Sequence, residues 1–296
     1  MLMIQMTGGL GNQMFQYAMY QELKYRGKEV SIDDFTKYDG QETHPNCITK
    51  VFDVMYELGT RKEYNRLTDS SLSFPARVKR KLLGRKQNIY QERDALEYSE
   101  DIFKQEDAYV IGYFQSEKYF AHVADSLRKQ YTFKERMIPS KAKEYQKQMQ
   151  SCNSVSVHIR RGDYISERFA PLYGGICTDA YYRGTMQYLR ERLDCPHFFL
   201  FTNDPDWVRA NMVEEDCVLV ECGEENADYL DMMLMSCCNH NIIANSSFSW
   251  WGAWLNPNVD KIVVAPSKWL NVTQADDVYA KCMEIRFDAE GEQVYG

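Results

Sequence analysis

SVSVHIRRGDY, residues 154–164, is a short apolar strand that ends in two arginines and a glycine–aspartate turn. Side chains alternate along a strand, so its apolar residues face one side, and His158 and Arg160 face the other. The apolar residues are Val155, Val157 and Ile159. Downstream, strands are predicted at residues 197–202, 217–222, 241–244 and 261–266, and helices at 179–193, 205–212, 227–238 and 248–255. Strands separated by single helices predict a parallel, doubly wound sheet.

The first half of the chain begins with the same order of signals. A strand at residues 1–6 leads through a glycine turn into a helix that ends near Tyr25, and a strand follows at 30–32. A strand is also predicted at 109–114 and helices at 117–131 and 141–150, whereas residues 60–105 carry no clear pattern. The length of 296 residues fits two domains. We therefore expect an α/β protein with domains at residues 1–150 and 151–296 and a cleft at the carboxyl ends of their strands.

Composition excludes some classes of function. The net charge of −8 disfavours a general nucleic-acid binder, because such a chain repels phosphate backbones. No run approaches the roughly 18 apolar residues of a membrane span. The first residues, MLMIQMTGG, lack a basic leader and a cleavage site, so a cytoplasmic protein is expected.

The glycine turn at residues 8–13, GGLGNQ, is a candidate phosphate site. Gly11, Asn12 and Gln13 open a helix whose free N–H groups and dipole favour an anion. An alternative is a dinucleotide fingerprint made by Gly9, Gly11 and Asp33, although Met14 stands where that fingerprint needs a third glycine. A plain strand-to-helix turn is the structural alternative.

The end of the strand at residues 154–159 is the strongest candidate for chemistry. A guanidinium offers fixed donors that match phosphate oxygens, so Arg160 beside His158 is placed to bind a diphosphate. Arg161 should point away and pair with Asp163 or another carboxylate. The alternative is an exposed basic strand end.

Asn203, Asp204 and Asp206 follow the strand at residues 197–202. A helix start is favoured, with Asn203 or Asp204 as N-cap and Pro205 in the first helical position. One of the two polar side chains would also hydrogen-bond to the edge of a nucleotide base. The alternative is a two-carboxylate clamp for Mg²⁺ or Mn²⁺ made by Asp204 and Asp206.

A second anion site is predicted where the strand at residues 241–244 ends. Asn245, Ser246, Ser247 and Phe248 open the next helix, and its hydroxyl and N–H groups favour phosphate. The tryptophans of that helix are expected to pack in the core. They are Trp250, Trp251 and Trp254.

Four blocks, GGLGNQMFQYA, HIRRGDY, FTNDPDW and NSSFSWWGAWL, together resemble the bacterial α-1,2-fucosyltransferases of glycosyltransferase family 11. The resemblance implies a GT-B-like fold with two Rossmann-like domains facing a cleft, the first for the acceptor and the second for GDP-β-L-fucose. It implies inverting transfer of L-fucose to the 2-hydroxyl of a β-linked galactose, with no metal or other cofactor. It also places His158, Arg160, Arg161 and Asp163 in the donor site.

The expected chemistry needs positive donors and a base. Charge that builds on the leaving GDP would meet Arg160 and the two helix N-termini. Asp163 is the candidate base for the acceptor hydroxyl, and a turn-capping aspartate is the alternative. Three other functions stay open: a metal-dependent GT-A glycosyltransferase using Asp204 and Asp206, an NAD-dependent oxidoreductase, and a non-catalytic carbohydrate-binding module using the tryptophans.

Residues 77–86 hold six cations in ten residues: Arg77, Lys79, Arg80, Lys81, Arg85 and Lys86. Phe74, Val78, Leu82 and Leu83 lie among them at helix-like spacing. One interpretation is peripheral contact with an anionic membrane, at its inner face, or with a lipid-linked pyrophosphate acceptor. The alternative is a solvated helix with Leu82 and Leu83 packed inward.

Overall fold

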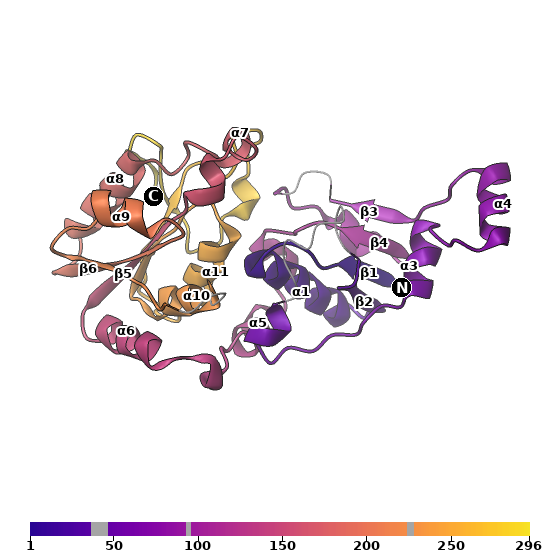
Figure 1. Ribbon diagram of the computed structural model, residues 1–296, viewed down its shortest axis with the longest axis horizontal. Coiled ribbons are helices and arrows are strands. Elements are labelled where there is room, and N and C mark those ends of the chain that lie inside the picture. The colour runs from indigo at the N-terminus through magenta and orange to yellow at the C-terminus, as the bar shows by residue number, and fades with distance from the viewer. Residues whose placement is uncertain (37–46, 93–95, 224–227) are drawn as a thin grey trace. The chain divides into compact units, whose positions relative to one another are not determined.

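The computed structural model describes residues 1–36, 47–92, 96–223 and 228–296, which form two compact units (Figure 1). The N-terminal unit is Met1–Thr132 and the C-terminal unit is Phe133–Gly296. The predicted boundary at residue 150 is therefore too late. Helix α6, Ser140–Gln150, belongs with the second unit because it packs on strand β5 and helix α10 of that unit.

The N-terminal unit is built on a four-stranded parallel sheet in the order β2-β1-β4-β3. The strands are β1 (Leu2–Gln5), β2 (Val30–Asp33), β3 (Ile89–Gln91) and β4 (Ala108–Ile111). Helix α1, Leu10–Tyr25, follows β1 and buries most of its residues. The predicted opening order of strand, turn, helix and strand is confirmed.

The remaining elements of this unit are short. They are α2 (Ile48–Val51), α3 (Arg61–Thr68), α4 (Phe74–Leu83), α5 (Ala124–Gln130) and the 3-10 turns Glu100–Lys104 and Glu117–Phe120. The single helix predicted at 117–131 is thus a 3-10 turn followed by α5. The strand predicted at 109–114 ends at Ile111, and Phe114 has a positive φ of 56°, which strand geometry does not allow.

The C-terminal unit contains a seven-stranded sheet in the order β11-β10-β9-β8-β5-β6-β7, parallel except for the β10–β11 pair. The strands are β5 (Asn153–Ile159), β6 (Pro196–Thr202), β7 (Cys217–Leu219), β8 (His240–Ile242), β9 (Val263–Pro266), β10 (Ile285–Phe287) and β11 (Gln293–Tyr295). The predicted parallel sheet is confirmed, and β10 and β11 extend it.

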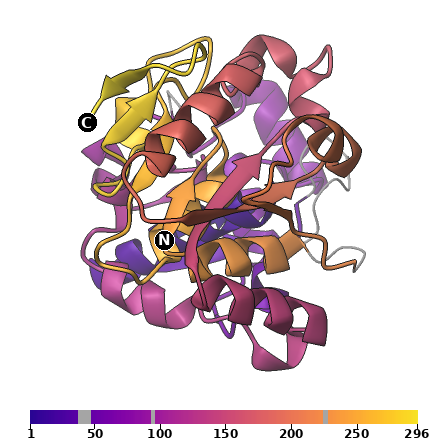
Figure 2. The ribbon, with the colours of Figure 1, turned by 90° about the vertical axis from the view of Figure 1, so that its left-hand side faces the viewer.

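Helices cover both faces of this sheet (Figure 2). They are α7 (Ala170–Tyr173), α8 (Asp179–Arg190), α9 (Pro205–Asn211), α10 (Asp228–Cys237) and α11 (Ser247–Leu255), besides α6. The predicted apolar face of β5 packs against Tyr181, Tyr182 and Leu189 of α8 in the core. Among the described residues, no helix is long and apolar enough to cross a bilayer.

Candidate functional site

The polar segments predicted after three different strands meet at one edge of the C-terminal sheet. In the parallel register, Ile159 of β5 pairs with Thr202 of β6, and Val157 of β5 pairs with Ile242 of β8. The segments that follow these strands therefore start side by side. This edge is the place where open α/β sheets bind ligands.

His158 lies on the face of β5 that is turned toward helix α11. Its ring centroid is 5.7 Å from that of Phe248, and its side chain is only 5% exposed. Burial, and then the charge of Arg160, lowers the pKa of His158 to about 3. His158 is therefore neutral at physiological pH. Its buried Nδ1 has no hydrogen-bond partner among the described residues.

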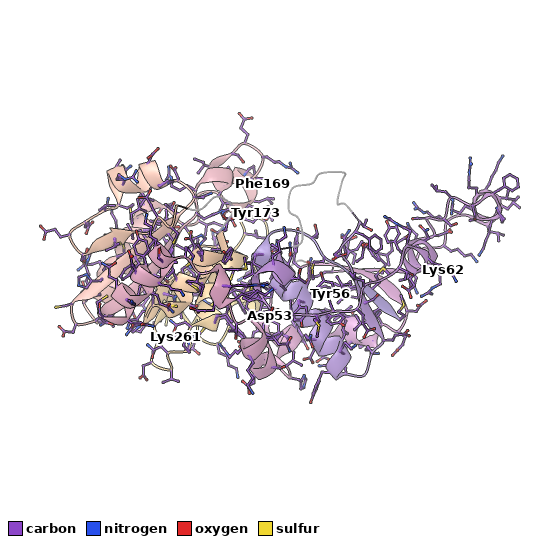
Figure 3. The ribbon with its side chains drawn as sticks, turned by 60° about the horizontal axis from the view of Figure 1, so that its bottom comes forward. Asp53, Tyr56, Lys62, Phe169, Tyr173 and Lys261 are labelled. Carbon is purple, nitrogen blue, oxygen red and sulfur yellow. The ribbon has the colours of Figure 1, made fainter. Side chains whose placement is uncertain are left out.

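Arg160 follows strand β5 and contacts two tyrosines. Its backbone N–H donates to the hydroxyl of Tyr182 at 3.4 Å, and its guanidinium carbon lies 5.5 Å from the centroid of the Tyr164 ring. Tyr164 stacks on Tyr173 at 4.7 Å, and its hydroxyl donates to the carbonyl of Asn245 at 3.0 Å. The ring of Phe169 lies 6.3 Å from that of Tyr173, and Figure 3 labels both residues.

Arg161 points to the other side of the strand end, as the alternation predicts. Its Nε donates to Asp204 Oδ2 at 3.4 Å, and an Nη1 atom lies 3.7 Å from Asp179 Oδ1. The guanidinium carbon sits 3.6 Å from the centroid of the Trp207 ring. The charge of Arg161 is therefore balanced by carboxylates of the protein.

Asp163 lies in the 3-10 turn Gly162–Ile165 directly after the two arginines. Its side chain is outside the described part of the structure. The assignment of Asp163 as the base stays a prediction.

Asn203 fixes the turn that carries these residues. Its Oδ1 accepts the backbone N–H of Arg161 at 3.0 Å. A Cβ atom on Gly162 would lie 2.3 Å from Asn203 Nδ2, so a larger residue there would displace this amide. These contacts indicate that Asn203 positions the turn that carries the two arginines. The sequence had instead suggested that Asn203 contacts the sugar-nucleotide donor.

Asp204 caps helix α9, as the favoured sequence interpretation predicts. Its Oδ1 accepts the N–H of Trp207 at 3.3 Å, and Pro205 occupies the first helical position. Asp206 forms an ion pair with Arg209 at 2.9 Å. Both carboxylates therefore have arginine partners, which argues against the two-carboxylate metal clamp.

The start of α11 forms the opposite wall of the site. The Oγ atom of Ser246 caps the helix by accepting the N–H of Phe248 at 3.3 Å, and Ser247 is the first helical residue. Asn245 is 2% exposed, and its Nδ2 donates to the carbonyl of Trp269 at 3.2 Å. The Asn245 side chain thus holds the loop that leads into α11.

The tryptophans of α11 lie in the core. Trp250 and Trp251 are 0% exposed and Trp254 is 1% exposed, and Trp250 donates to the carbonyl of Val278 at 2.7 Å. The predicted core packing is confirmed. A carbohydrate-binding module that uses these rings is excluded because a sugar cannot reach them.

In the N-terminal unit, the glycine turn before α1 is held by side-chain amides. Gln13 Oε1 accepts the N–H of Cys47 at 2.9 Å, and Gln13 Nε2 donates to the carbonyl of Gly8 at 2.8 Å. Asn12 Oδ1 accepts Nε2 of Gln115 at 2.8 Å. We therefore assign Gln13 to shaping the turn. The N–H group of Asn12 donates to the carbonyl of Gly9 at 3.0 Å, which contradicts the predicted anion contact through this residue. The contact through Gly11 stays a prediction.

Asp33 contradicts the NAD alternative. The residue is 0% exposed, its Oδ1 accepts the N–H groups of Phe35 and Thr36, and its Oδ2 accepts the hydroxyl of Tyr109 at 2.7 Å. Both oxygens are occupied inside the protein, so this carboxylate cannot bind a ribose.

Sequence reasoning missed two carboxyl groups with raised pKa values. Glu92 follows β3 and is 7% exposed, and burial raises its pKa to about 7 although the N–H groups of Phe114 and Tyr113 oppose the shift. Asp231 lies in the first turn of α10, where burial and then Asp228 raise its pKa to about 7. Neither group belongs to a recognisable motif, and only the three-dimensional packing reveals them.

The comparisons with known proteins concern the family and the fold of the chain. The sequence profile described as "Glycosyl transferase family 11" matches residues 1–283. An alpha-1,2-colitosyltransferase of Escherichia coli is 36% identical over 89% of this chain and 90% of its own length. The O-antigen biosynthesis glycosyltransferase WbnK of Escherichia coli is 31% identical over 89% of this chain and 93% of its own. Galactoside alpha-(1,2)-fucosyltransferase 1 of Aotus azarae is 28% identical over 46% of this chain and 40% of its own.

Among solved structures, the NodZ alpha-1,6-fucosyltransferase co-crystallized with GDP superposes with a TM-score of 0.50 and 14% identity, over 86% of this chain and 92% of that chain. This likeness shows the fold alone, which is α/β and GT-B-like as predicted. The profile match extends over both units. The chain belongs to glycosyltransferase family 11.

Proposed function

We propose that this glycosyltransferase moves L-fucose from GDP-β-L-fucose, with inversion, to the 2-hydroxyl of a β-linked galactose. Family membership and the α-1,2 linkage in the names of two relatives support the reaction class. The observation that carries the donor assignment is the contact of His158 with Phe248 in the first turn of α11, two residues before Arg160 in the chain. A half-buried cation and a helix N-terminus at one edge suit a sugar diphosphate.

The leaving group defines what these residues must do. Breaking the bond between the sugar and the phosphate leaves negative charge on GDP while positive charge develops at the anomeric carbon. Arg160 and the α11 N–H groups would stabilise the charge on the phosphate. His158 would contribute a hydrogen bond from a neutral ring, because its pKa is lowered to about 3.

The remaining step is attack by the acceptor hydroxyl. Asp163, next to the two arginines, is the proposed base. We propose that no divalent metal takes part, because Arg160 and the helix N-terminus already supply positive charge. Acceptor binding by the N-terminal unit follows the family fold.

A second candidate donor is favoured by one observation. The relative at 36% identity is named for the transfer of colitose. Colitose is L-fucose without its 3-hydroxyl, so the same diphosphate site would serve both sugars. Discrimination must then come from residues around the sugar ring.

The test is an assay of the purified protein with GDP-fucose and GDP-colitose against a panel of β-galactosides, before and after exhaustive chelation with EDTA. We expect turnover with GDP-fucose, an α-1,2 linkage in the NMR spectrum of the product, and full activity after chelation. Exclusive use of GDP-colitose would move the assignment to the second donor. Activity lost in EDTA and restored by Mn²⁺ would contradict the metal-free mechanism.

A matched pair of variants links the assay to the site. Arg160→Ala removes the proposed phosphate donor, and Arg192→Ala removes an exposed arginine of the same unit. We expect a loss of about 100-fold to 1000-fold in turnover for the first variant, as for one transition-state donor, and nearly full activity for the second. Equal activities of the two variants would refute the assignment of Arg160.

A further inference from the structure

Helix α4, Phe74–Leu83, has an apolar surface that the N-terminal unit does not cover. None of its residues is buried. Phe74 is 78% exposed, Leu82 is 76% exposed and Leu83 is 62% exposed. The interpretation in which Leu82 and Leu83 pack inward is therefore wrong. Figure 1 shows α4 standing apart from the sheet, and in Figure 3 it lies beyond the labelled Lys62 of α3.

The apolar side chains form one stripe along the helix. Phe74, Val78 and Leu82 follow one another at intervals of four residues and line a shallow hollow together with Pro75. A stripe of this kind normally faces a core. Here it has no covering element within the described residues.

Arg80 determines which way the stripe points, because it lies on the other side of the helix. Its Nη1 donates to the carbonyl of Asp69 at 3.0 Å, and its Nη2 donates to the carbonyl of Ser71 at 2.6 Å. These bonds hold the Arg80 side of α4 against the preceding loop. The stripe of Phe74, Val78 and Leu82 consequently faces away from the unit.

Cations border the stripe. Arg77, Lys79 and Lys81 are exposed, and no ion pair with them occurs in the described part of the chain. Residues 70–91 contain no aspartate or glutamate, although the whole chain carries a net charge of −8. An apolar stripe with a basic border is the pattern of a helix that lies in the plane of a membrane interface.

We propose that α4 docks on an anionic lipid bilayer, with its apolar stripe among the acyl chains and its lysines at the phosphate headgroups. Charge complementarity favours this occupant over a second copy of the chain. Two copies that met through this stripe would bring their basic borders together and repel each other. An anionic surface is attracted by the same borders.

The experiment is co-sedimentation of the full chain with vesicles of phosphatidylcholine alone or of phosphatidylcholine and phosphatidylglycerol in equal amounts. We expect binding to the anionic vesicles that weakens as salt is raised, and little binding to the neutral ones. Phe74→Ser with Leu82→Ser should abolish binding. Lys79→Gln with Lys81→Gln should weaken it about thirtyfold, from the usual contribution of two basic residues.

Matched control variants replace residues of the same types at other surface positions. Lys141→Gln with Lys147→Gln removes two exposed lysines of α6, and Met55→Ser with Val259→Ser removes two exposed apolar side chains. Both controls should bind like the wild type. In Phe74→Trp, anionic vesicles should shift the added tryptophan emission to shorter wavelengths, which reports insertion.

Several outcomes would overturn the proposal. The first is equal binding of the wild type and of the Phe74→Ser, Leu82→Ser variant. The second is equal binding to anionic and neutral vesicles. The third is a wild-type dimer in solution that this variant converts to monomer. All residues changed here are exposed, so the thermal unfolding of the variants should match that of the wild type. The vesicle assay uses neither donor nor acceptor, so its result is independent of the proposed fucosyl transfer.

Discussion

Replacing Arg161 by alanine separates the two adjacent arginines by function. Arg160 faces the site with His158, whereas Arg161 stacks on Trp207 at 3.6 Å and contacts Asp204 and Asp179. Arg161→Ala should therefore lower stability and affect chemistry only through the position of its neighbour. Arg160→Ala should lower turnover with little change in stability.

The size of the stability loss follows from these contacts. A guanidinium over a partly exposed indole contributes roughly 0.5 to 1 kcal/mol. The partner carboxylates, which are 32% and 60% exposed, each contribute at most about 0.5 kcal/mol because water screens them. The sum is about 1.5 kcal/mol, equivalent to a fall in Tm of roughly 3 to 6 °C for a unit of this size.

The assay pairs urea and thermal unfolding with kcat/KM for both alanine variants. We expect Arg161→Ala to unfold earlier and to keep turnover within about tenfold of the wild type. Asp204→Asn keeps an N-cap but removes the charge, so a double-mutant cycle with Arg161→Ala isolates their pair. A stable but inactive Arg161→Ala protein, together with an active Arg160→Ala protein, would refute the strand register argued here.

Two further predictions concern titration. His158 should stay neutral from pH 8 down to about pH 4, because its pKa is lowered to about 3, and an imidazole NMR resonance titrating near 6.5 would contradict its burial. Glu92 should make the protein less stable as pH rises, because the pKa of its carboxyl is about 7 in the folded state and 4.5 in the unfolded state. Between pH 4.5 and pH 7, folding therefore takes up a proton. The full effect is about 3 kcal/mol, and urea unfolding of Glu92→Gln should show a flatter pH dependence by that amount.

Regular patterns in the sequence predict the C-terminal unit well. The alternation at residues 154–160 places Val157 in the core and His158 on the other face, because a strand in a covered sheet has two distinct sides. The dipeptide Asp204–Pro205 indicates a helix start for the same local reason. Such features depend on neighbours in the chain, so a single sequence reveals them.

Other features depend on contacts between distant residues. Asn203 holds Arg161 and lies against Gly162, yet its sequence context also fits a ligand contact. The carboxyl of Glu92 is buried by residues about twenty positions away, and no local pattern reports that burial. The secondary structure of residues 60–105 could not be predicted for a related reason. Helix α4 in this segment is amphipathic but has no core to face.

The charges at the donor edge explain why His158 must be neutral in the free protein. Arg161 is compensated by Asp204 and Asp179, whereas Arg160 lies two residues after His158 on the same side of the strand end. A protonated His158 next to Arg160 would add a second positive charge inside a buried site, which burial and repulsion both oppose. A diphosphate bound there, as we propose, would add negative charge and offset the repulsion between His158 and Arg160. The pKa of His158 should therefore rise when GDP binds.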